Sequence, residues 1–524
     1  MSKFLLILLF FSFAFAKTVW VSNKGSNTNG NGTEFNPYQT VRYAVPLADS
    51  GDTIRMKAGS YGYTTVNTSK ILYFQGQSTT LTLYTGQIYY NTPEGTEFTG
   101  TMFSEMQFVS KARMLYFANP TTFNNVIWEK IAFYLDGDIT DPDALVNLKN
   151  IKVTGENGFK INSVVFSTSA FKNPYNAIFN FDINGGPFYL SNIFVTGYDT
   201  TSKHSSQVMI TGNTESLTIS RSRTSGGGNF YIKNAKNVYI HGTQFYDASL
   251  ALDSCQTVSL TSNSFINSGK YTIYSPNEDN LEHTGGIAIL GTEKNAIVKD
   301  IQIMKNKFIG IVRTSCILVN RWNGEPTSET FKNVELSDND FSQIEQNYDE
   351  VYAVNLNFSK VKINANYNYW GSKYGPRKCR LDLKDCKSTE KQKIRARGNV
   401  EAEYWYCSSE MKNDVDDGNK CPTPTPTATP TPTPTPTPST KPKESGLTKG
   451  EKWAIGITVP VGAILIIGGI VVLIMINKKK KVKGSSTGGS PPKGWKKISG
   501  NQSSSNESDE SALLDSELTD SDLD

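Results

Sequence analysis

Charged residues and histidine are scarce in this sequence. Only 19% of the 524 residues are charged, the net charge is +4, and three residues are histidine. So small and dispersed a positive charge gives no reason to expect a nucleic-acid partner. With so few histidines, the chain also has few ordinary general bases for acid and base catalysis. Its surface must consist largely of Asn, Ser, Thr, Gly and Tyr, which favours a neutral, hydrogen-bonding ligand such as a sugar.

Cysteine is also rare, with six residues in the chain. No C-x-x-C motif or His-rich metal spacing occurs, so we predict no metal site and no cofactor. Four cysteines crowd together near the end of the folded region, which in an oxidising compartment predicts two disulfides in a small C-terminal cap over residues 377–421. These four are Cys379, Cys386, Cys407 and Cys421, and three pairings are open. The other two, Cys255 and Cys316, lie in apolar strands and are predicted to be buried thiols.

Two long apolar runs occur near the ends of the chain. The first follows Met1-Ser2-Lys3 and closes on Ala14-Phe15-Ala16, a pattern that predicts a secretory signal peptide over residues 1–16. The second, residues 453–476, carries no charge and is long enough for one transmembrane helix. Five lysines soon after it indicate the cytosolic flank and suit an anionic lipid bilayer. We therefore predict a single-pass type I membrane protein, with residues 17 to about 452 outside the cytosol.

Two segments of biased composition flank the predicted transmembrane helix. Residues 422–450 are rich in Pro and Thr and are predicted to form an extended polyproline II stalk. Residues 477–524 are predicted to be a disordered cytosolic tail. In this tail, Asp509, Leu513 and Leu514 resemble the acidic dileucine sorting signal, which implies a clathrin adaptor as a partner. Outside the cytosol, N-glycosylation is predicted at the three sequons of Asn31, Asn67 and Asn357, where these are exposed.

A repeat runs through the second half of the folded region. Six segments open with an apolar, any, apolar step, and they start at Leu217, Val238, Val258, Ile301, Val334 and Val361. Five residues after the last four starts stand Asn263, Asn306, Asn339 and Asn366, and seven residues after four of the starts stand Phe245, Phe265, Phe308 and Phe341. Short strands with an asparagine ladder at a bend and an inward stack of Phe explain this pattern. The interval of 43 residues from Val258 to Ile301 allows either a long insertion or two turns of the repeat.

Residues 17–376 resemble the pectin-lyase-like, right-handed parallel β-helix superfamily. Gly51-Asp-Thr-Ile54, followed by Gly59 and Tyr61, is similar to the first-coil motif of such proteins, and Asn366-Tyr-Asn-Tyr-Trp-Gly371 is similar to their closing segment. Val41, Ala44, Val45 and Ala48 have helical spacing and predict a capping helix, which Pro46 makes short or kinked. The resemblance implies an all-β solenoid whose open end needs such a cap.

Activity cannot be carried over from this superfamily. Members that cleave acidic polysaccharides use clustered carboxylates that hold calcium, with Arg or Lys as base, or paired Asp; of the hydrolase motifs only His241-Gly242 is matched in part here. Catalytic residues are therefore unassigned, and whether the chain is an enzyme is open. Candidate ligand-binding residues lie in successive coils and in one loop: Arg221, Arg223, His241, Asp247, Asp253, Arg321, Trp322 and Asn323. The alternative is that these side chains are solvated, outward strand positions without a ligand. For Trp322, the alternative is that its ring only covers the edge of a coil.

Three functions are consistent with the sequence. The first is a cell-surface or endolysosomal glycoprotein whose β-helix binds carbohydrate or another surface ligand, located at the plasma membrane, in endosomes and lysosomes, or in both. The second is a membrane-tethered polysaccharide lyase or glycosidase, and the third is a structural or adhesion coat protein. Acidic and basic groups that converge in one groove with room for a sugar would favour the enzyme.

Overall fold

The structure of the chain is a computed structural model. It describes residues 16–66, 70–110, 114–135, 146–168, 179–197, 207–269, 273–275, 278–281, 285–311, 315–344, 351–381, 392, 394–411 and 415–416. Several predicted features lie outside these ranges: most of the signal peptide, the stalk, the span 453–476, the tail with its sorting signal, Asn67, Cys386 and Cys421. Among the described residues, no helix is long and apolar enough to cross a membrane.

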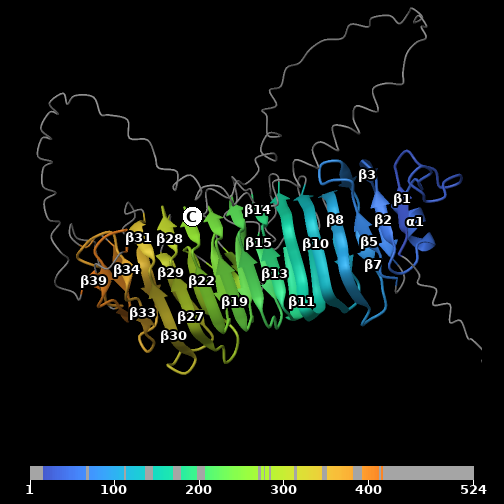
Figure 1. Cartoon of the computed structure of the whole chain (residues 1–524). Coiled ribbons are helices and arrows are strands. Elements are labelled where there is room, and N and C mark those ends of the chain that lie inside the picture. Colours follow the sequence, from blue (N-terminus) through green and yellow to red (C-terminus); the bar gives the residue numbers. More distant parts are fainter. Residues whose placement is uncertain are drawn as a thin grey trace, which may run out of the picture. The chain divides into compact units, whose positions relative to one another are not determined.

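The described chain winds into a parallel β-helix whose coils each contribute to three sheets (Figure 1). Sheet A contains β1 (Thr18–Val21), β2 (Thr53–Met56), β5 (Tyr73–Gln75), β13 (Phe188–Ser191), β16 (Leu217–Ser220), β19 (Asn237–His241), β22 (Thr257–Thr261), β27 (Val298–Met304), β30 (Phe331–Ser337), β33 (Ile363–Asn364) and β37 (Val400–Glu401). Five of the six predicted starts lie in strands of this sheet, as expected.

Sheets B and C follow sheet A in each coil. Sheet B contains β3 (Gly59–Tyr61), β6 (Thr82–Tyr84), β14 (Phe194–Thr196), β17 (Arg223–Ser225), β20 (Gln244–Tyr246), β23 (Ser264–Ile266), β28 (Lys307–Ile309), β31 (Asp340–Gln343), β34 (Asn368–Tyr369) and β38 (Trp405–Tyr406). Sheet C contains β4 (Thr64–Val66), β7 (Ile88–Tyr90), β9 (Leu115–Phe117), β12 (Phe179–Gly185), β15 (Gln207–Thr211), β18 (Asn229–Lys233), β21 (Leu250–Asp253), β26 (Ile287–Gly291), β29 (Ser315–Trp322), β32 (Tyr352–Leu356) and β36 (Arg395–Arg397).

Three long strands bend round the corners between sheets. They are β8 (Glu97–Ser110), β10 (Thr121–Leu135) and β11 (Val146–Thr168). Strand β11 pairs in turn with β12, β13 and β14, so one continuous strand serves all three sheets. The C-terminal end of the coil carries β35 (Arg377–Cys379), which pairs with β36, and β39 (Val415–Asp416), which runs antiparallel to β38. The fold is all-β apart from one described helix, and it is the parallel β-helix that the resemblance implied.

The long interval between Val258 and Ile301 is an insertion rather than two coils. Strand β22 pairs directly with β27, in the register Val258↔Ile301. The inserted chain contains the antiparallel hairpin of β24 (Ile273–Ser275) and β25 (Glu278–Leu281), and β24 lies against β18 of sheet C.

The predicted inward stack of Phe is confirmed. Rings of Phe245, Phe265, Phe308 and Phe341 are parallel within 17°, with centroids 4.7 to 5.1 Å apart, and Trp370 extends the stack. All of these side chains are fully buried. They fill the core between the sheets, where a ring of this size buries about 150–250 Å².

An asparagine ladder lies at the corner between sheets A and B, and its last member differs from the residue that the sequence predicts. The ladder consists of Asn263, Asn306, Asn339 and Asn368, not Asn366. The reason is that Glu335 pairs with Asn364, so the last strand begins at Ile363 instead of Val361 and the ladder position moves by two residues. Asn366 instead uses its side-chain oxygen to accept the amides of Glu403 and Tyr404.

One residue per coil at this corner adopts a left-handed backbone. The φ values lie between 48° and 60°, and the residues are Glu105, Lys130, Ser163, Asn192, Arg221, Gly242, Ser262, Lys305, Asp338 and Tyr367. All but one carry a side chain, although such φ values are uncommon outside glycine. In each coil, the side chain of this residue and the side chain of the residue two positions further along the chain lie at the same corner. Together these side chains form an outer edge of the coil, here called the ridge.

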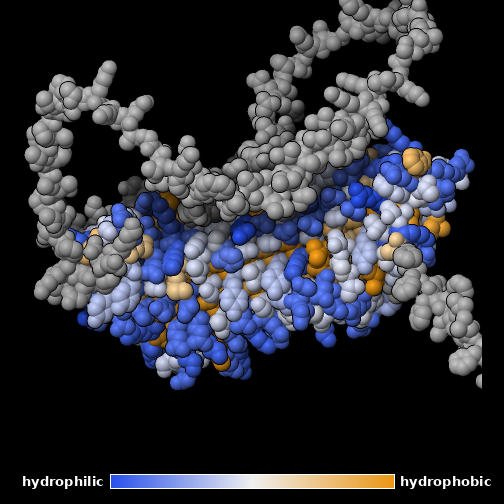
Figure 2. Space-filling model, viewed as in Figure 1, coloured by the Kyte–Doolittle hydropathy of each residue, from blue (hydrophilic) through white to orange (hydrophobic). Residues whose placement is uncertain are grey.

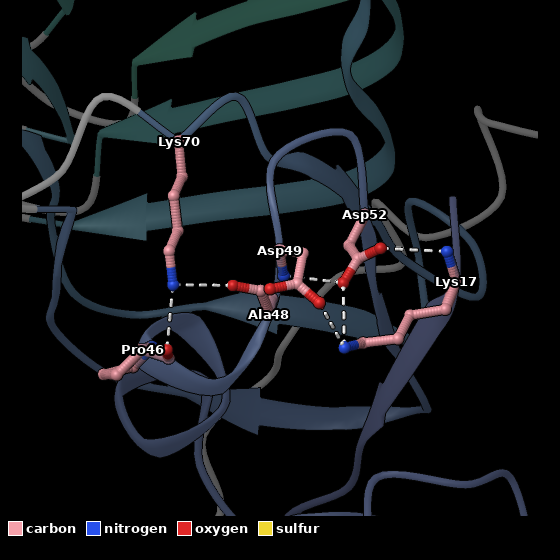
Figure 3. Close-up of polar contacts among 6 residues, drawn as sticks. All are labelled: Lys17, Pro46, Ala48, Asp49, Asp52 and Lys70. Atoms are coloured by element: carbon pink, nitrogen blue, oxygen red, sulfur yellow. Dashed lines mark hydrogen bonds and ion pairs between the residues drawn. The ribbon is translucent and has the colours of Figure 1, made fainter. Parts of the chain in front are cut away.

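The N-terminal end is closed by α1 (Val41–Leu47), as predicted. Thr40 caps its start, and Lys70 donates to the carbonyl oxygens of Pro46 and Ala48 at its end, at 2.9 and 2.7 Å (Figure 3). The main-chain nitrogen of Lys17 donates to the buried carboxylate of Asp52 at 2.9 Å. Signal cleavage after residue 16 would free this same nitrogen, which would then bring a positive charge to Asp52.

At the C-terminal end, Cys379 and Cys407 are both disulfide-bonded. Their pairing stays a prediction, because Cys386 and Cys421 lie outside the described residues. Cys255 and Cys316 are free and buried, as predicted. Burial raises the pKa of Cys255 to about 12, so this thiol stays protonated at physiological pH.

A buried tyrosine near the N-terminal end predicts alkaline sensitivity. Burial raises the pKa of Tyr61 to about 12, while its hydroxyl donates to the carbonyl oxygen of Lys57 at 2.7 Å. Between its ordinary pKa of about 10 and pH 12, this phenol ionises only in the unfolded chain. Between pH 10 and pH 12 the free energy of unfolding should therefore fall by about 1.4 kcal/mol per pH unit for this group.

Urea unfolding at several pH values measures how steeply the free energy of unfolding falls with pH. Tyr61→Phe should reduce this slope, whereas Tyr43→Phe, at an exposed ring, should not. Equal slopes in both variants would contradict the assignment.

Candidate ligand-binding site

The structure distributes the sequence-predicted site residues over several faces. Arg221 and Arg223 are exposed on the ridge, His241 is exposed at the end of β19 in sheet A, and Asp247 follows β20 at the corner between sheets B and C. Among the described contacts, none of these four side chains makes a hydrogen bond or an ion pair. Arg221 and His241 are neighbours on successive coils, where the main-chain nitrogen of Arg221 donates to the carbonyl oxygen of His241 at 3.1 Å, whereas Asp247 lies at another corner.

Asp253 has a different environment on the outer side of sheet C. Its carboxylate is fully buried and accepts hydrogen bonds from the hydroxyl of Tyr231 at 2.6 Å and the hydroxyl of Ser254 at 2.9 Å. The amide and the hydroxyl of Thr292 also donate to it, the amide at 2.9 Å. Beside it, the buried ammonium of Lys233 pairs with Glu293 at 2.6 Å. Because its acceptor positions are occupied from within the chain, this carboxylate is placed to stabilise the fold rather than to meet a ligand.

The loop candidates lie at the end of β29. Trp322 is half-buried, and its ring packs edge-on against Phe331 and Phe358. It also covers Gly291, where a Cβ atom would lie 2.5 Å from the indole. Asn323 is exposed, and its main-chain nitrogen donates to the carbonyl oxygen of Gly291 at 2.7 Å. These contacts indicate that Trp322 covers the edge of the coil. The side chain of Arg321 lies outside the described part of the chain. Binding at these residues stays a prediction.

The predicted glycosylation sites that can be placed are accessible. Asn31 and Asn357 are both exposed. Glycans at these positions stay a prediction.

The outer side of sheet A is a long polar surface. One row of outward positions reads, coil by coil, Trp20, Arg55, Gln75, Ser104, Glu129, Asn162, Ser191, Ser220, His241, Thr261, Met304 and Ser337. Successive members lie roughly 4.8 Å apart, the spacing of neighbouring strands. Figure 2 shows the side of the coil that carries β13, β19 and β22 as mostly blue to white, with scattered orange residues. Such a surface presents repeated hydroxyl and amide groups along one line.

This surface is hollowed near its N-terminal end, where β2, β5, β8 and β10 lie side by side. The hollow, here called the glutamate hollow, has a volume of about 400 Å³ and is lined by Thr53, Tyr73, Phe74, Gln75, Thr101, Ser104, Glu105, Glu129 and Lys130. Register places Gln75, Ser104 and Glu129 next to one another on three successive coils. Glu105 follows Ser104 at a left-handed residue, which turns it back toward Gln75, whose side-chain nitrogen donates to it at 3.2 Å.

The chemistry of the glutamate hollow suits a polyhydroxylated ligand. Tyr73 is half-buried and offers a ring face, while two carboxylates and an amide accept hydrogen bonds from hydroxyl groups. Glu129 and Lys130 have no described ion pair or side-chain hydrogen bond, so both remain available to a ligand. Across the described residues, no three His, Cys, Asp or Glu side chains group so as to hold a metal ion.

No family model and no curated protein matches the chain. Among solved structures, the catalytic domain of a GH87 α-1,3-glucanase in complex with tetrasaccharides covers 75% of this chain and 69% of its own length, at 12% identity and a TM-score of 0.37. A mannuronic acid specific polysaccharide family 6 lyase from human gut microbiota covers 67% and 82%, at 12% identity and 0.36. The A-module of the Azotobacter vinelandii mannuronan C-5 epimerase AlgE4 covers 56% and 86%, at 11% identity and 0.29. At TM-scores below 0.5, these likenesses say nothing about the function of this chain.

Proposed function

We propose that the β-helix is a carbohydrate-binding domain, that an extended sugar chain lies along the outer side of sheet A, and that the glutamate hollow is its most selective subsite. The observation that carries this proposal is the combination, in one hollow, of the Tyr73 ring with the carboxylates of Glu105 and Glu129 and the amide of Gln75. Sugars are bound by this chemistry, since a ring packs on their C–H face while carboxylates and amides accept their hydroxyl protons. The polar row that continues beyond the hollow gives a longer chain further contacts.

The setting of this domain is proposed from the sequence. The signal pattern and the apolar span support a location of the coil outside the cytosol, at the cell surface or in an endolysosomal compartment. The lipid bilayer and a clathrin adaptor are the further partners that the two terminal regions imply.

Tyr73→Ala should weaken sugar binding about fivefold to tenfold, because the ring contact is lost while the fold is retained. The ligand is first found by testing the purified full-length chain on an array of neutral and acidic glycans. Isothermal titration with the best oligosaccharide then compares Tyr73→Ala with Tyr246→Ala, which removes an exposed ring from sheet B. Unchanged affinity in Tyr73→Ala, or equal losses in both variants, would show that the hollow is not the binding site.

A second candidate function is glycoside cleavage in the same hollow. Paired carboxylates in one hollow are the groups that glycosidases use, one as acid and the other as base or nucleophile, and both Glu105 and Glu129 line this one. In the same titration samples, release of new reducing ends measures turnover. If the chain cleaves the sugar, and Glu129→Gln abolishes cleavage while binding persists, the chain is a glycosidase. If the sugar binds and no product forms, the chain is a binding domain without this activity.

A further inference from the structure

A second hollow lies on the ridge, far along the coil from the glutamate hollow. Its volume is about 590 Å³, and it is lined by Lys305, Asn306, Lys307, Asp338, Asp340 and Tyr406, with Ser409 and Met411 from the C-terminal segment. Here it is called the lysine hollow. It lies where two neighbouring coils carry Lys-Asn-Lys and Asp-Asn-Asp at the same ridge positions.

The backbone fixes the positions from which the charged side chains of the lysine hollow extend. Lys305 and Asp338 are the left-handed residues of their coils, with φ of 57° and 56°, and the asparagine between each charged pair is locked into the buried ladder. Lys307 and Asp340 are paired in strand register between β28 and β31. The four charged side chains therefore extend from an ordered backbone, so that binding does not have to order the main chain.

The acidic groups of the lysine hollow are occupied, whereas the basic groups are not. Asp338 accepts a hydrogen bond from the hydroxyl of Tyr406 at 2.6 Å, and Asp340 accepts the main-chain amide of Ser342 at 2.9 Å. The side chains of Lys305 and Lys307 have no ion pair and no hydrogen bond among the described contacts, whereas the main-chain nitrogens of both residues donate hydrogen bonds. Two exposed ammonium groups thus remain to meet an anion, and each carboxylate keeps a second oxygen for a hydroxyl donor.

The cations that line this hollow are lysines. A lysine ammonium is a compact charge with three rotatable donors, which suits the three free oxygens of a tetrahedral sulfate or phosphate ester. Arginine, whose planar fork binds a carboxylate or a phosphate at two points, is absent from the lining residues of this hollow. Burial and the hydrogen bond to Asp338 raise the pKa of Tyr406 to about 12.

We infer that the lysine hollow binds a saccharide bearing a sulfate or phosphate ester, with the ester between Lys305 and Lys307 and the sugar hydroxyls on Asp338 and Asp340. This inference rests on the proposed function only in taking a sugar as the carrier of the anion. The site is separate from the glutamate hollow and uses none of its residues.

Titration of the purified full-length chain with galactose sulfate, galactose phosphate, galacturonate and galactose tests the inference. The two esters should bind, and their affinity should fall as salt is added, because exposed charges are screened. Lys305→Gln with Lys307→Gln should weaken ester binding roughly tenfold or more, since two charge-assisted bonds are lost. The matched control, Lys294→Gln with Lys299→Gln, removes the same charge outside the hollow and should leave ester binding unchanged.

Three outcomes would overturn the inference: no ester binding, ester binding that both lysine pairs affect equally, or galacturonate binding as tightly and with the same dependence on Lys305 and Lys307. The oligosaccharide selected for the glutamate hollow is titrated into the same variants. Its binding should be insensitive to Lys305 and Lys307, so a failure at the lysine hollow is distinguished from a failure of the proposed function at Tyr73.

Discussion

Asn306→Ala is expected to lower the free energy of unfolding by about 3 to 5 kcal/mol, among the largest effects of any single substitution in the coil. The Asn306 side chain is buried and bonded on every side. Its oxygen accepts the amide and the side-chain nitrogen of Asn263, and its nitrogen donates to the oxygens of Leu260, Met304 and Asn339. Alanine leaves these partners in a place that water does not reach, and each unsatisfied buried group costs about 1 to 3 kcal/mol.

Chemical unfolding of the full-length chain, followed by circular dichroism, measures the loss. Asn323→Ala is the matched control, because its side chain is exposed and makes no described hydrogen bond, so its effect should stay within about 0.5 kcal/mol. A loss at Asn306 no larger than at Asn323 would mean that the ladder does not stabilise the coil. A loss accompanied by a smaller denaturant slope would instead indicate that part of the coil unfolds separately.

The ladder also shows why the sequence predicts one half of the fold better than the other. In the C-terminal coils an asparagine marks each bend, and the Phe that follows marks the core, so both appear at fixed offsets in the sequence. In the preceding coils the ladder position is held by Met106, Ile131, Val164, Ile193, Ser222 and Thr243. Aliphatic residues at this position are indistinguishable from ordinary core residues, so the pattern gives no sign of the coils before Leu217.

The glutamate hollow is not visible in the sequence for the same physical reason. Tyr73, Glu105 and Glu129 are separated by more than twenty residues each, and only the strand register of coils without a visible repeat brings them together. The lysine hollow carried a signal that was available, since Lys-Asn-Lys and Asp-Asn-Asp occupy the ladder motif of neighbouring coils. Reading the residues on either side of each ladder asparagine would have placed these charges side by side. Arg221 and Arg223 lie on the ridge and His241 lies in the outward row of sheet A, and ligand binding at these three residues stays a prediction.

Replacement of Asp253 tests whether this buried carboxylate on the outer side of sheet C stabilises the fold or binds a ligand. Asp253→Asn is expected to lower the free energy of unfolding by about 2 to 4 kcal/mol. An amide accepts with one end only, so part of the set formed by Tyr231, Ser254 and Thr292 loses its acceptor. The substitution also removes a negative charge beside the buried ammonium of Lys233.

Asp247→Asn makes the same chemical change at a residue whose side chain has no described partner, and asparagine tolerates its left-handed backbone. The unfolding free energy of this control should change by less than about 0.5 kcal/mol. A functional carboxylate behaves in the opposite way: residues kept for a ligand are often a strain on the fold, and replacing them leaves stability unchanged or raises it. If Asp253→Asn were as stable as the unchanged chain while glycan binding or cleavage disappeared, the role assigned to Asp253 here would be wrong, and the active surface would lie on sheet C instead of sheet A.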